Sequence, residues 1–246
     1  MAQLGIQLYT VRDAMAKDYT GTLREIARIG YPTIEGGGTG PLTVDAFNAL
    51  MKELKLNPIG AHVGLDPLID KPAEALAVHK AIGTKYIALS ASGKSADDYK
   101  KLGERLSRAG KNCLERGITL QYHNHAHEFQ TFGGKLGLEI IYETADPKYV
   151  KAQIDVGWVQ RAGADPVAWL KKMKGRIVTI HLKDTTDGAD PQWTEVGTGV
   201  LPLAAVAKAA KEIGVEYYFI EQDTCARPSL ESAAISFTNA RTALAL

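Results

Sequence analysis

The sequence predicts an α/β fold in which eight parallel strands alternate with eight helices and close into a (β/α)8 barrel. Short apolar runs alternate with longer amphipathic stretches from end to end, and 246 residues is a typical length for eight such units. No linker or low-complexity segment divides the chain, so we expect one domain over residues 1–246. An open doubly wound sheet is the rival, but the glycine-rich stretch at 36–40 lacks the Gly-x-Gly-x-x-Gly dinucleotide spacing.

The elements follow one another in strict alternation. The predicted strands are residues 4–9, 33–36, 58–63, 86–90, 118–123, 150–156, 177–182 and 217–222. The predicted helices are residues 20–29, 44–56, 73–82, 96–116, 136–143, 166–173, 203–213 and 229–244. Thr43 and Asp165 suit helix N-caps, with Pro166 at a first helical position. Glycines expected just past helix ends, where a left-handed cap favours them, are Gly30, Gly83, Gly117 and Gly214.

Charge and hydropathy exclude several classes of protein. Lys plus Arg number 29 and Asp plus Glu 28, a net charge of +1 without long runs of one sign, which argues against a nucleic-acid partner. No stretch approaches 18 consecutive apolar residues, so we expect no membrane span. The N-terminal residues lack a signal-peptide pattern, so we expect a cytoplasmic protein, or a periplasmic one if a signal has been removed. The oligomeric state stays open.

The strand ends gather ionisable side chains. Along residues 177–182, Val178, Ile180 and Leu182 share one face, while Thr179, His181 and the following Lys183 share the other. The other strands repeat this division into an apolar face and a face whose last residues are ionisable. In a barrel these second faces converge at the C-terminal mouth, where the active sites of such enzymes lie.

Several of these strand-end residues suit a divalent metal. Asp155, His181 and Glu221 end adjacent strands and form a mixed nitrogen and oxygen donor set. We expect Mn²⁺, with Zn²⁺, Co²⁺, Fe²⁺ or Mg²⁺ as alternatives, rather than Ca²⁺, which prefers oxygen ligands alone. His123 and His125 are two residues apart, so both point into the mouth if the strand continues; a histidine-rich surface turn is the alternative.

In this order, the motifs resemble the xylose-isomerase-like TIM-barrel superfamily, the sugar phosphate isomerase/epimerase group. The segments that carry the resemblance are residues 5–13, 122–125 with 128–129, 154–158, 162–166, 175–177, 181–184 and 197–199. The resemblance implies a metal held by Asp155, His181 and Glu221. The family's fourth ligand is usually a strand-five glutamate two residues before a histidine, and here His123 stands at that position and His125 at the next.

That departure affects the chemistry that the resemblance implies. The family's sugar 3-epimerases use two facing metal-bound glutamates as paired acid and base groups, and His123 replaces one of them. The inosose dehydratases and dehydroshikimate dehydratases use a strand-five histidine as a base, which brings them closer to this chain.

The sequence therefore predicts a metal-dependent isomerase or epimerase acting on a sugar or cyclitol through an enediolate. His125 or Glu221 would remove the proton next to a carbonyl. Lys183 or Glu35 would return a proton to carbon, or protonate a leaving hydroxyl, which makes a dehydratase the alternative. Lys183 could equally form an ion pair, and Glu35 could bind a sugar hydroxyl. The residues assigned to substrate binding, with packing or capping as the alternative, are His62, Trp158 and Trp193.

Two further functions stay as alternatives. A non-catalytic sugar-binding barrel would share the fold without the chemistry. Endonuclease action at abasic DNA sites would require more metal ligands and a basic surface, and neither is evident in the sequence. The residues leave the particular sugar open, and also whether it is phosphorylated.

Overall fold

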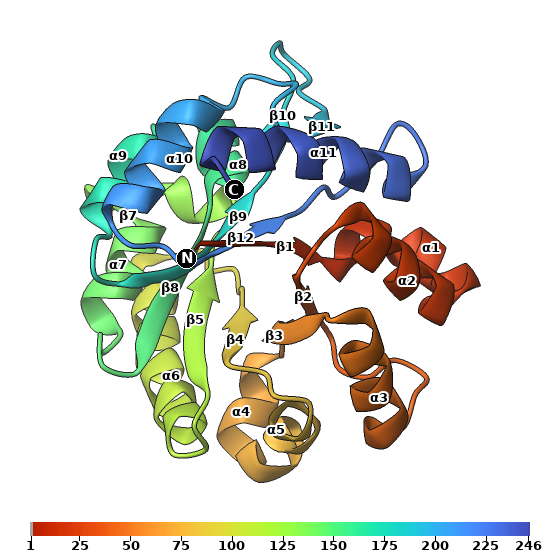
Figure 1. The fold of residues 1–246 in the computed structure, drawn as a ribbon. Helices are drawn as coiled ribbons and strands as arrows, with labels where there is room; N and C mark the ends of the chain where they lie inside the picture. The colour runs from red at the N-terminus through yellow and green to blue at the C-terminus, as the bar shows by residue number, and fades with distance from the viewer. Residues whose placement is uncertain (1) are drawn as a thin grey trace.

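Eight parallel strands form a closed barrel in the computed structural model, which describes residues 2–246 (Figure 1). Their order around the barrel is β1-β12-β9-β8-β5-β4-β3-β2. Each barrel strand therefore pairs with the barrel strands that come just before and just after it in the chain, and the last one, β12, pairs with the first, β1. The bounds of the strands are β1 Gln3–Gln7, β2 Thr33–Gly36, β3 Asn57–His62, β4 Tyr86–Leu89, β5 Thr119–His123, β8 Val150–Asp155, β9 Ile177–Leu182 and β12 Tyr217–Ile220. The predicted barrel is confirmed.

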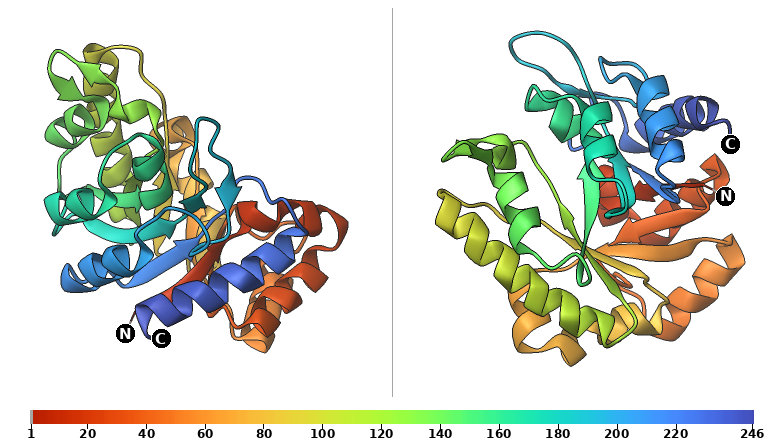
Figure 2. Two further views of the ribbon diagram at one scale, coloured as in Figure 1. Left: turned by 90° about the horizontal axis from the view of Figure 1, so that it is seen from above. Right: turned by 90° about the vertical axis from the view of Figure 1, so that its left-hand side faces the viewer.

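Eight main helices cover the outside of the barrel (Figure 2). They are α2 Tyr19–Ile29, α3 Val44–Leu54, α5 Pro72–Ala81, α6 Ala96–Leu114, α7 Gly137–Thr144, α9 Pro166–Lys172, α10 Leu203–Glu212 and α11 Ser229–Leu244. The Thr43 hydroxyl accepts the Ala46 N–H, and the Asp165 carboxylate accepts two N–H groups of α9, so both predicted N-caps are present. Gly30 ends α2 at φ 116°, a left-handed conformation that glycine adopts without strain.

Short elements that the sequence did not predict fill the connections between the main strands and helices. The helical ones are η1 Leu8–Val11, α1 Arg12–Lys17, α4 Leu65–Asp70, α8 Val156–Arg161 and η2 His127–Phe129. Two small hairpins, β6 Thr131–Phe132 with β7 Lys135–Leu136 and β10 Asp184–Thr185 with β11 Trp193–Thr194, complete the set. Most of them follow the C-terminal ends of barrel strands, so they shape the mouth.

Two predicted strands are too long at the mouth. The prediction continued the first strand to Tyr9 and the sixth to Val156, but Gln7 and Asp155 act as N-caps instead. The Gln7 side-chain oxygen accepts the Tyr9 N–H, and Asp155 Oδ1 accepts the Trp158 N–H at 2.9 Å. A side chain that satisfies a free N–H of the first turn favours the helix over the extended strand at that point.

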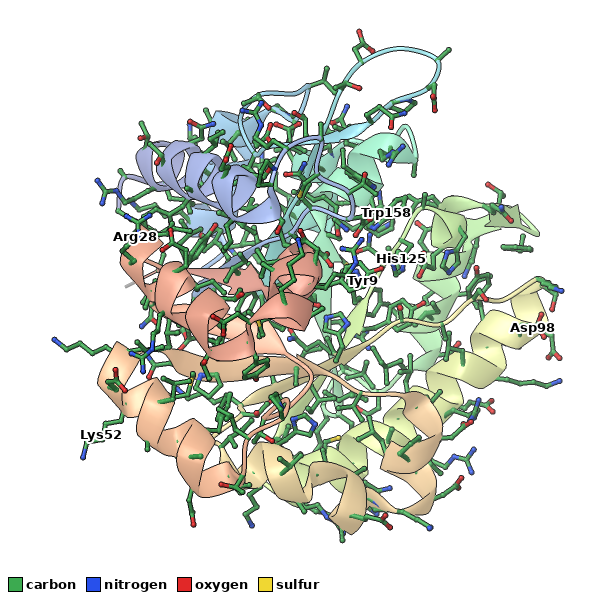
Figure 3. The ribbon with its side chains drawn as sticks, turned by 90° about the vertical axis from the view of Figure 1, so that its right-hand side faces the viewer. Tyr9, Arg28, Lys52, Asp98, His125 and Trp158 are labelled. Atoms are coloured by element: carbon green, nitrogen blue, oxygen red, sulfur yellow. The ribbon has the colours of Figure 1, made fainter. Side chains whose placement is uncertain are left out.

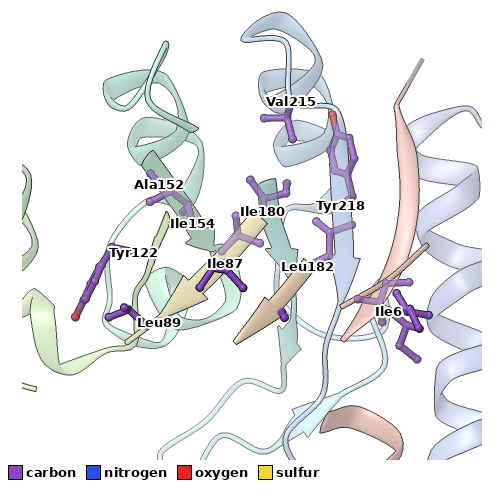
Figure 4. Packing of buried hydrophobic residues seen from close by; sticks show 14 of the residues in the cluster. Ile6, Ile87, Leu89, Tyr122, Ala152, Ile154, Ile180, Leu182, Val215 and Tyr218 are labelled. Atoms are coloured by element: carbon purple, nitrogen blue, oxygen red, sulfur yellow. The ribbon is translucent and has the colours of Figure 1, made fainter. Parts of the chain in front are cut away.

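The hydrophobic core lies between the strands and the helix layer. Ile154, Ile180 and Leu182 point outward from β8 and β9 into this layer, and all three are fully buried (Figure 4). The opposite faces of the same strands carry polar side chains into the barrel, where the Thr179 hydroxyl donates to Gln121 and accepts from Gln153. The division between the two faces of each strand is the one that the alternating sequence predicts. Among residues 2–246, no helix is both long enough and apolar enough to cross a bilayer.

Candidate active site

Four buried side chains from consecutive barrel strands converge at the mouth. His123 ends β5, Asp155 ends β8, His181 lies in β9 and Glu221 follows β12; each of them can place one ligand atom within 4.8 Å of the others'. The most exposed of the four, Glu221, is only 7% exposed. The register of the parallel strands produces this convergence. His181 in β9 is paired with Asp155 of β8 on one side and with Phe219 of β12, two residues before Glu221, on the other.

The residues of this four-residue cluster fit a divalent metal. Two imidazoles and two carboxylates are a donor set that Mn²⁺, Fe²⁺, Co²⁺ and Zn²⁺ accept. Asp155 Oδ2 is buried and has no hydrogen-bond partner among the described residues, and the cation that faces it, Lys183 Nζ, lies 3.4 Å away, so its burial is only partly compensated. Burial raises the pKa of Asp155 to about 6, partly countered by Lys183. A divalent ion would remove that penalty.

Glu35 lies beneath the cluster with both of its carboxylate oxygens engaged. Its Oε1 accepts from His62 Nε2 at 2.6 Å, Gln7 Nε2 at 2.7 Å and His181 Nε2 at 2.9 Å. Its Oε2 accepts from Gln153 Nε2 at 2.8 Å. Burial would raise the pKa of Glu35, but the imidazoles of His181 and His62 more than offset this and lower it. A fully buried, fully bonded carboxylate of this kind orients its neighbours.

The ring of His181 is fixed by carboxylates on both sides. Its Nε2 is bonded to Glu35, and its Nδ1 lies 2.8 Å from Glu221 Oε2. Burial disfavours the charged imidazole, but Glu35 and Glu221 together raise the pKa of His181 to about 10. A metal at the cluster would take the Nδ1 lone pair, while Nε2–H would go on donating to Glu35. Carboxylates commonly orient metal-bound histidines in this way.

Lys183 provides a buried cation beside the cluster. Its Nζ lies 2.9 Å from Asp223 Oδ1, 3.0 Å from Glu221 Oε2 and 3.4 Å from Asp155 Oδ2, and the residue is only 1% exposed. Burial would lower the pKa of this ammonium, but Glu221, Asp155 and Asp223 raise it. Lys183 is therefore held as a permanent positive charge among three carboxylates.

The two predicted stacking platforms surround this lysine. The rings of Trp158 and Trp193 meet edge to face at 4.7 Å, and Lys183 Nζ lies 5.3 Å and 4.8 Å from their centroids. The Arg161 guanidinium also lies over the Trp193 ring, 4.1 Å from its centroid. In this arrangement, the indoles contact the Lys183 cation; stacking of either on a sugar remains a prediction.

His125 lies beside the cluster and opens to solvent. Figure 3 shows it at the mouth with Trp158 and Tyr9 nearby. The buried carboxylate of Glu128 accepts the His125 backbone N–H at 2.8 Å and the Tyr122 hydroxyl at 2.7 Å, which fixes the turn after β5. Burial, with Lys183 and His127 nearby, lowers the pKa of His125 to about 4, so the imidazole is neutral near pH 7. A neutral imidazole can accept a proton.

A polar cavity of about 430 Å³ lies over these groups. Its lining brings together the predicted residues His62, His123, His125 and Glu221. It also includes residues that the sequence did not single out, namely Tyr9, Arg12, Ser90, Asp223 and Thr224. Asp223 could have been found from its spacing, since it is two residues beyond Glu221, whereas Arg12 reaches the mouth only because the short helices η1 and α1 follow β1. Glu35 and Lys183 lie beneath this cavity instead of on its surface.

The Gly197–Gly199 turn is occupied by the chain's own carboxylate. Asp184 Oδ2 accepts the N–H groups of Gly197 and Gly199 at 2.9 and 3.1 Å, and Oδ1 accepts that of Leu201 at 2.9 Å. These are the donors that a barrel of this type commonly offers to a phosphate. Because the Asp184 carboxylate already takes these N–H groups, the turn does not present them to a ligand in this structure.

Comparison with known proteins agrees with the fold. A family described as xylose isomerase-like TIM barrel matches residues 23–238, and the chain belongs to this family. Inosose dehydratase 2 of Bacillus cereus is 33% identical over 89 residues, which is 36% of this chain and only 29% of that relative.

Solved structures show the same fold. A sugar phosphate isomerase/epimerase from Parabacteroides distasonis ATCC 8503 superposes with a TM-score of 0.86, covering 100% of this chain and 95% of that one at 22% identity. The IOLI protein with a bound zinc atom superposes with a TM-score of 0.74, covering 99% and 98% at 16% identity. The chain thus has the fold of its xylose isomerase-like family, and proteins named as isomerase, epimerase and dehydratase are among its relatives and structural neighbours.

Proposed function

We propose that this protein is a divalent-metal-dependent isomerase or epimerase that moves a proton at a carbon next to the carbonyl of a sugar or cyclitol. The observation that carries the proposal is the juxtaposition of the four-residue cluster with a neutral histidine. His123, Asp155, His181 and Glu221 form the cluster, and His125 lines the same polar cavity. The zinc-bound IOLI structure, which shares the fold, supports a divalent ion in such a barrel.

The cluster would hold the metal, which when bound would polarise the substrate carbonyl as a Lewis acid. Lys183 keeps Asp155 and Glu221 ionised through its ion pairs with both carboxylates. Glu35 fixes the tautomer of His181 by accepting its Nε2–H. The chain's own residues thereby orient three of the four donors before any substrate binds, which reduces the reorganisation needed during reaction.

His125 is the base that the geometry favours. It is half-buried at the cavity wall, and its Nδ1 has no hydrogen-bond partner among the described residues. Glu128 holds its backbone N–H, and its ring packs against the rings of His127 and Trp158, which together define the position of the ring at the cavity. His62 and Asp223 both line the cavity. His62 can return a proton to the substrate, whereas the Asp223 carboxylate, paired with Lys183 at 2.9 Å, would have to take up a proton before it could give one. Glu35 and Lys183, assigned this task from the sequence, would act as positioning residues, since neither has a free polar face.

Dehydration is the second candidate. The inosose dehydratase relatives favour it, although the match spans less than a third of their length. The proton-transfer groups facing the cavity are also chemically unequal, imidazoles on one wall and the Asp223 carboxylate on another. Unequal groups suit a reaction in which one removes a proton from carbon and the other protonates a departing hydroxyl.

A substrate panel in D₂O tests the proposal. Ketoses, keto-sugars and inososes would be incubated with Mn²⁺-loaded protein and followed by NMR. We expect solvent deuterium at carbon with at least one compound, and its loss in His125→Asn with Mn²⁺ binding retained. His79→Asn, which changes a histidine on the outer helix α5, is the matched control. No deuterium and no turnover across the panel would contradict the proposal, whereas loss of water from the substrate would select dehydration.

A further inference from the structure

A second and larger cavity adjoins the polar one. It encloses about 550 Å³ and shares four lining residues with the polar cavity, namely Tyr9, Arg12, His62 and Glu221. The two cavities therefore adjoin at these four residues, with a polar chamber over the metal-binding cluster and a second chamber beside it. We call this second chamber the side groove.

The wall of the side groove formed by η1, α1 and α2 is mainly apolar. Leu8, Met15, Ala16 and Tyr19 line it. Tyr9 stands at the junction of the two chambers and is 51% exposed, unusual for an aromatic ring that is not needed in the core. The Arg12 guanidinium lies 4.0 Å from the centroid of the Tyr9 ring and donates to the carbonyls of Tyr9 and Asp223, which holds the ring in place.

The opposite wall is backbone without side chains. Gly36, Gly37, Gly38 and Gly40 line it, in the loop after β2. Gly40 has φ 59°, and a Cβ there would collide with the Tyr19 ring, so glycine lets the loop lie directly on that ring. A Cβ at Gly37 would meet no atom within 4 Å. The loop therefore leaves the side groove open where other residues would fill it.

We propose that the substrate of this site is a sugar or cyclitol ring that carries an aryl or alkyl substituent, with the ring in the polar chamber and the substituent in the side groove. This inference rests on the proposed function for the ring that it places over the cluster. A free polyol ring presents hydroxyls in all directions, and burying them against Leu8 and Met15 would leave their hydrogen bonds unmade. A planar apolar group instead fits among Leu8, the Tyr9 ring and the glycine backbone at residues 36–38.

Paired glycosides test this inference. Binding of 4-nitrophenyl and methyl β-glycosides of glucose and of galactose to Mn²⁺-loaded protein would be measured by calorimetry. Within a pair the sugar is constant, so the difference reports the substituent. We expect the aryl compound of at least one pair to bind about tenfold or more tightly, because the ring loses apolar surface to the groove.

Substitutions at Gly37 locate the effect. Gly37 lines the groove, so Gly37→Phe would add a ring to the groove wall and should abolish the aryl preference without weakening methyl glycoside binding, while Gly37→Ala, the matched control, should retain the preference. Equal binding within every pair, no binding by any aryl compound, or a preference that Gly37→Phe leaves unchanged would overturn the inference. Deuterium exchange without an aryl preference would overturn this inference and leave the proposed reaction intact. An aryl preference without deuterium exchange on any compound would support this inference and contradict the proposed reaction.

Discussion

Replacing Glu35 with glutamine should weaken metal binding although Glu35 is not a ligand. The oxygen of the introduced amide could still accept from Gln7, His62 and His181 in the place of Oε1. The NH₂ of that amide would then face the Gln153 Nε2–H group, which now donates to Oε2 at 2.8 Å, so two donors would meet.

Gln153 cannot rotate its amide without further losses. Its Nε2 also donates to Thr179 at 2.9 Å, and its Oε1 lies 3.1 Å from His123 Nδ1. A flip would therefore disturb the orientation of His123, while the missing charge would weaken the hold on His181. Loss of such an outer carboxylate typically lowers metal affinity by about 10–100-fold, or roughly 1.4–2.8 kcal/mol.

The assay is a Mn²⁺ titration of Glu35→Gln and wild type by calorimetry, with thermal unfolding to confirm that both fold. Glu195→Gln is the matched control, since Glu195 is also buried but bonds to Ser232 and Arg227, away from the cluster. An affinity within about twofold of wild type in a folded Glu35→Gln protein would refute the reasoning that Glu35 orients a metal-bound His181.

Three further predictions concern single side chains. Lys183→Met should destabilise the metal-free protein by about 3–5 kcal/mol, since three carboxylates lose a buried counter-ion, and Mn²⁺ should raise its melting temperature more than that of wild type. Arg176→Met should cost about 2–4 kcal/mol in urea unfolding, because Arg176 donates to three backbone carbonyls, those of Tyr142, Ala145 and Val150. His79 is buried and its pKa is lowered by burial, so the unfolded chain takes up its proton first as the pH falls below about 6.5; His79→Leu should reduce the stability lost between about pH 7 and pH 5.

Each of these has a contrary outcome that is easy to recognise. For Lys183→Met it is an unchanged melting temperature without metal. For Arg176 it is a variant as stable as Arg241→Met, which changes an arginine on the exposed side of α11. For His79 it is an acid sensitivity equal to that of wild type.

The sequence was sufficient to predict the barrel because the same unit repeats eight times along the chain. In each unit a strand in which apolar and polar residues alternate is followed by a helix. The faces of β9 illustrate this, since Ile180 and His181 lie on the sides that alternation assigns to them. It was not sufficient for the short helices α1 and α8, whose six residues are fewer than two turns and show no periodicity.

The residues of the four-residue cluster could also be predicted from their positions at strand ends. The roles of the residues next to the cluster could not. Glu35 and Lys183 are ionisable residues at strand ends, as are several of the groups that face the cavity. Their hydrogen bonds come from strands distant in the sequence, such as Gln153 to Glu35, and only the closed barrel brings these partners together. Asp184 was likewise visible in its motif, but its bonds to the Gly197–Gly199 turn depend on how the loop folds back.

The most direct test of the central claim is the stoichiometry of Mn²⁺ binding, measured by electron paramagnetic resonance on wild type and Asp155→Asn. Asparagine keeps an oxygen in the place of Oδ1, which caps α8, and replaces Oδ2, which accepts no hydrogen bond among the described residues and faces Lys183 Nζ at 3.4 Å. We predict one tightly bound Mn²⁺ per wild-type chain and its loss in a folded Asp155→Asn protein. A wild-type chain that binds no divalent ion, or a variant that binds it as tightly, would contradict the assignment of the cluster as a metal site.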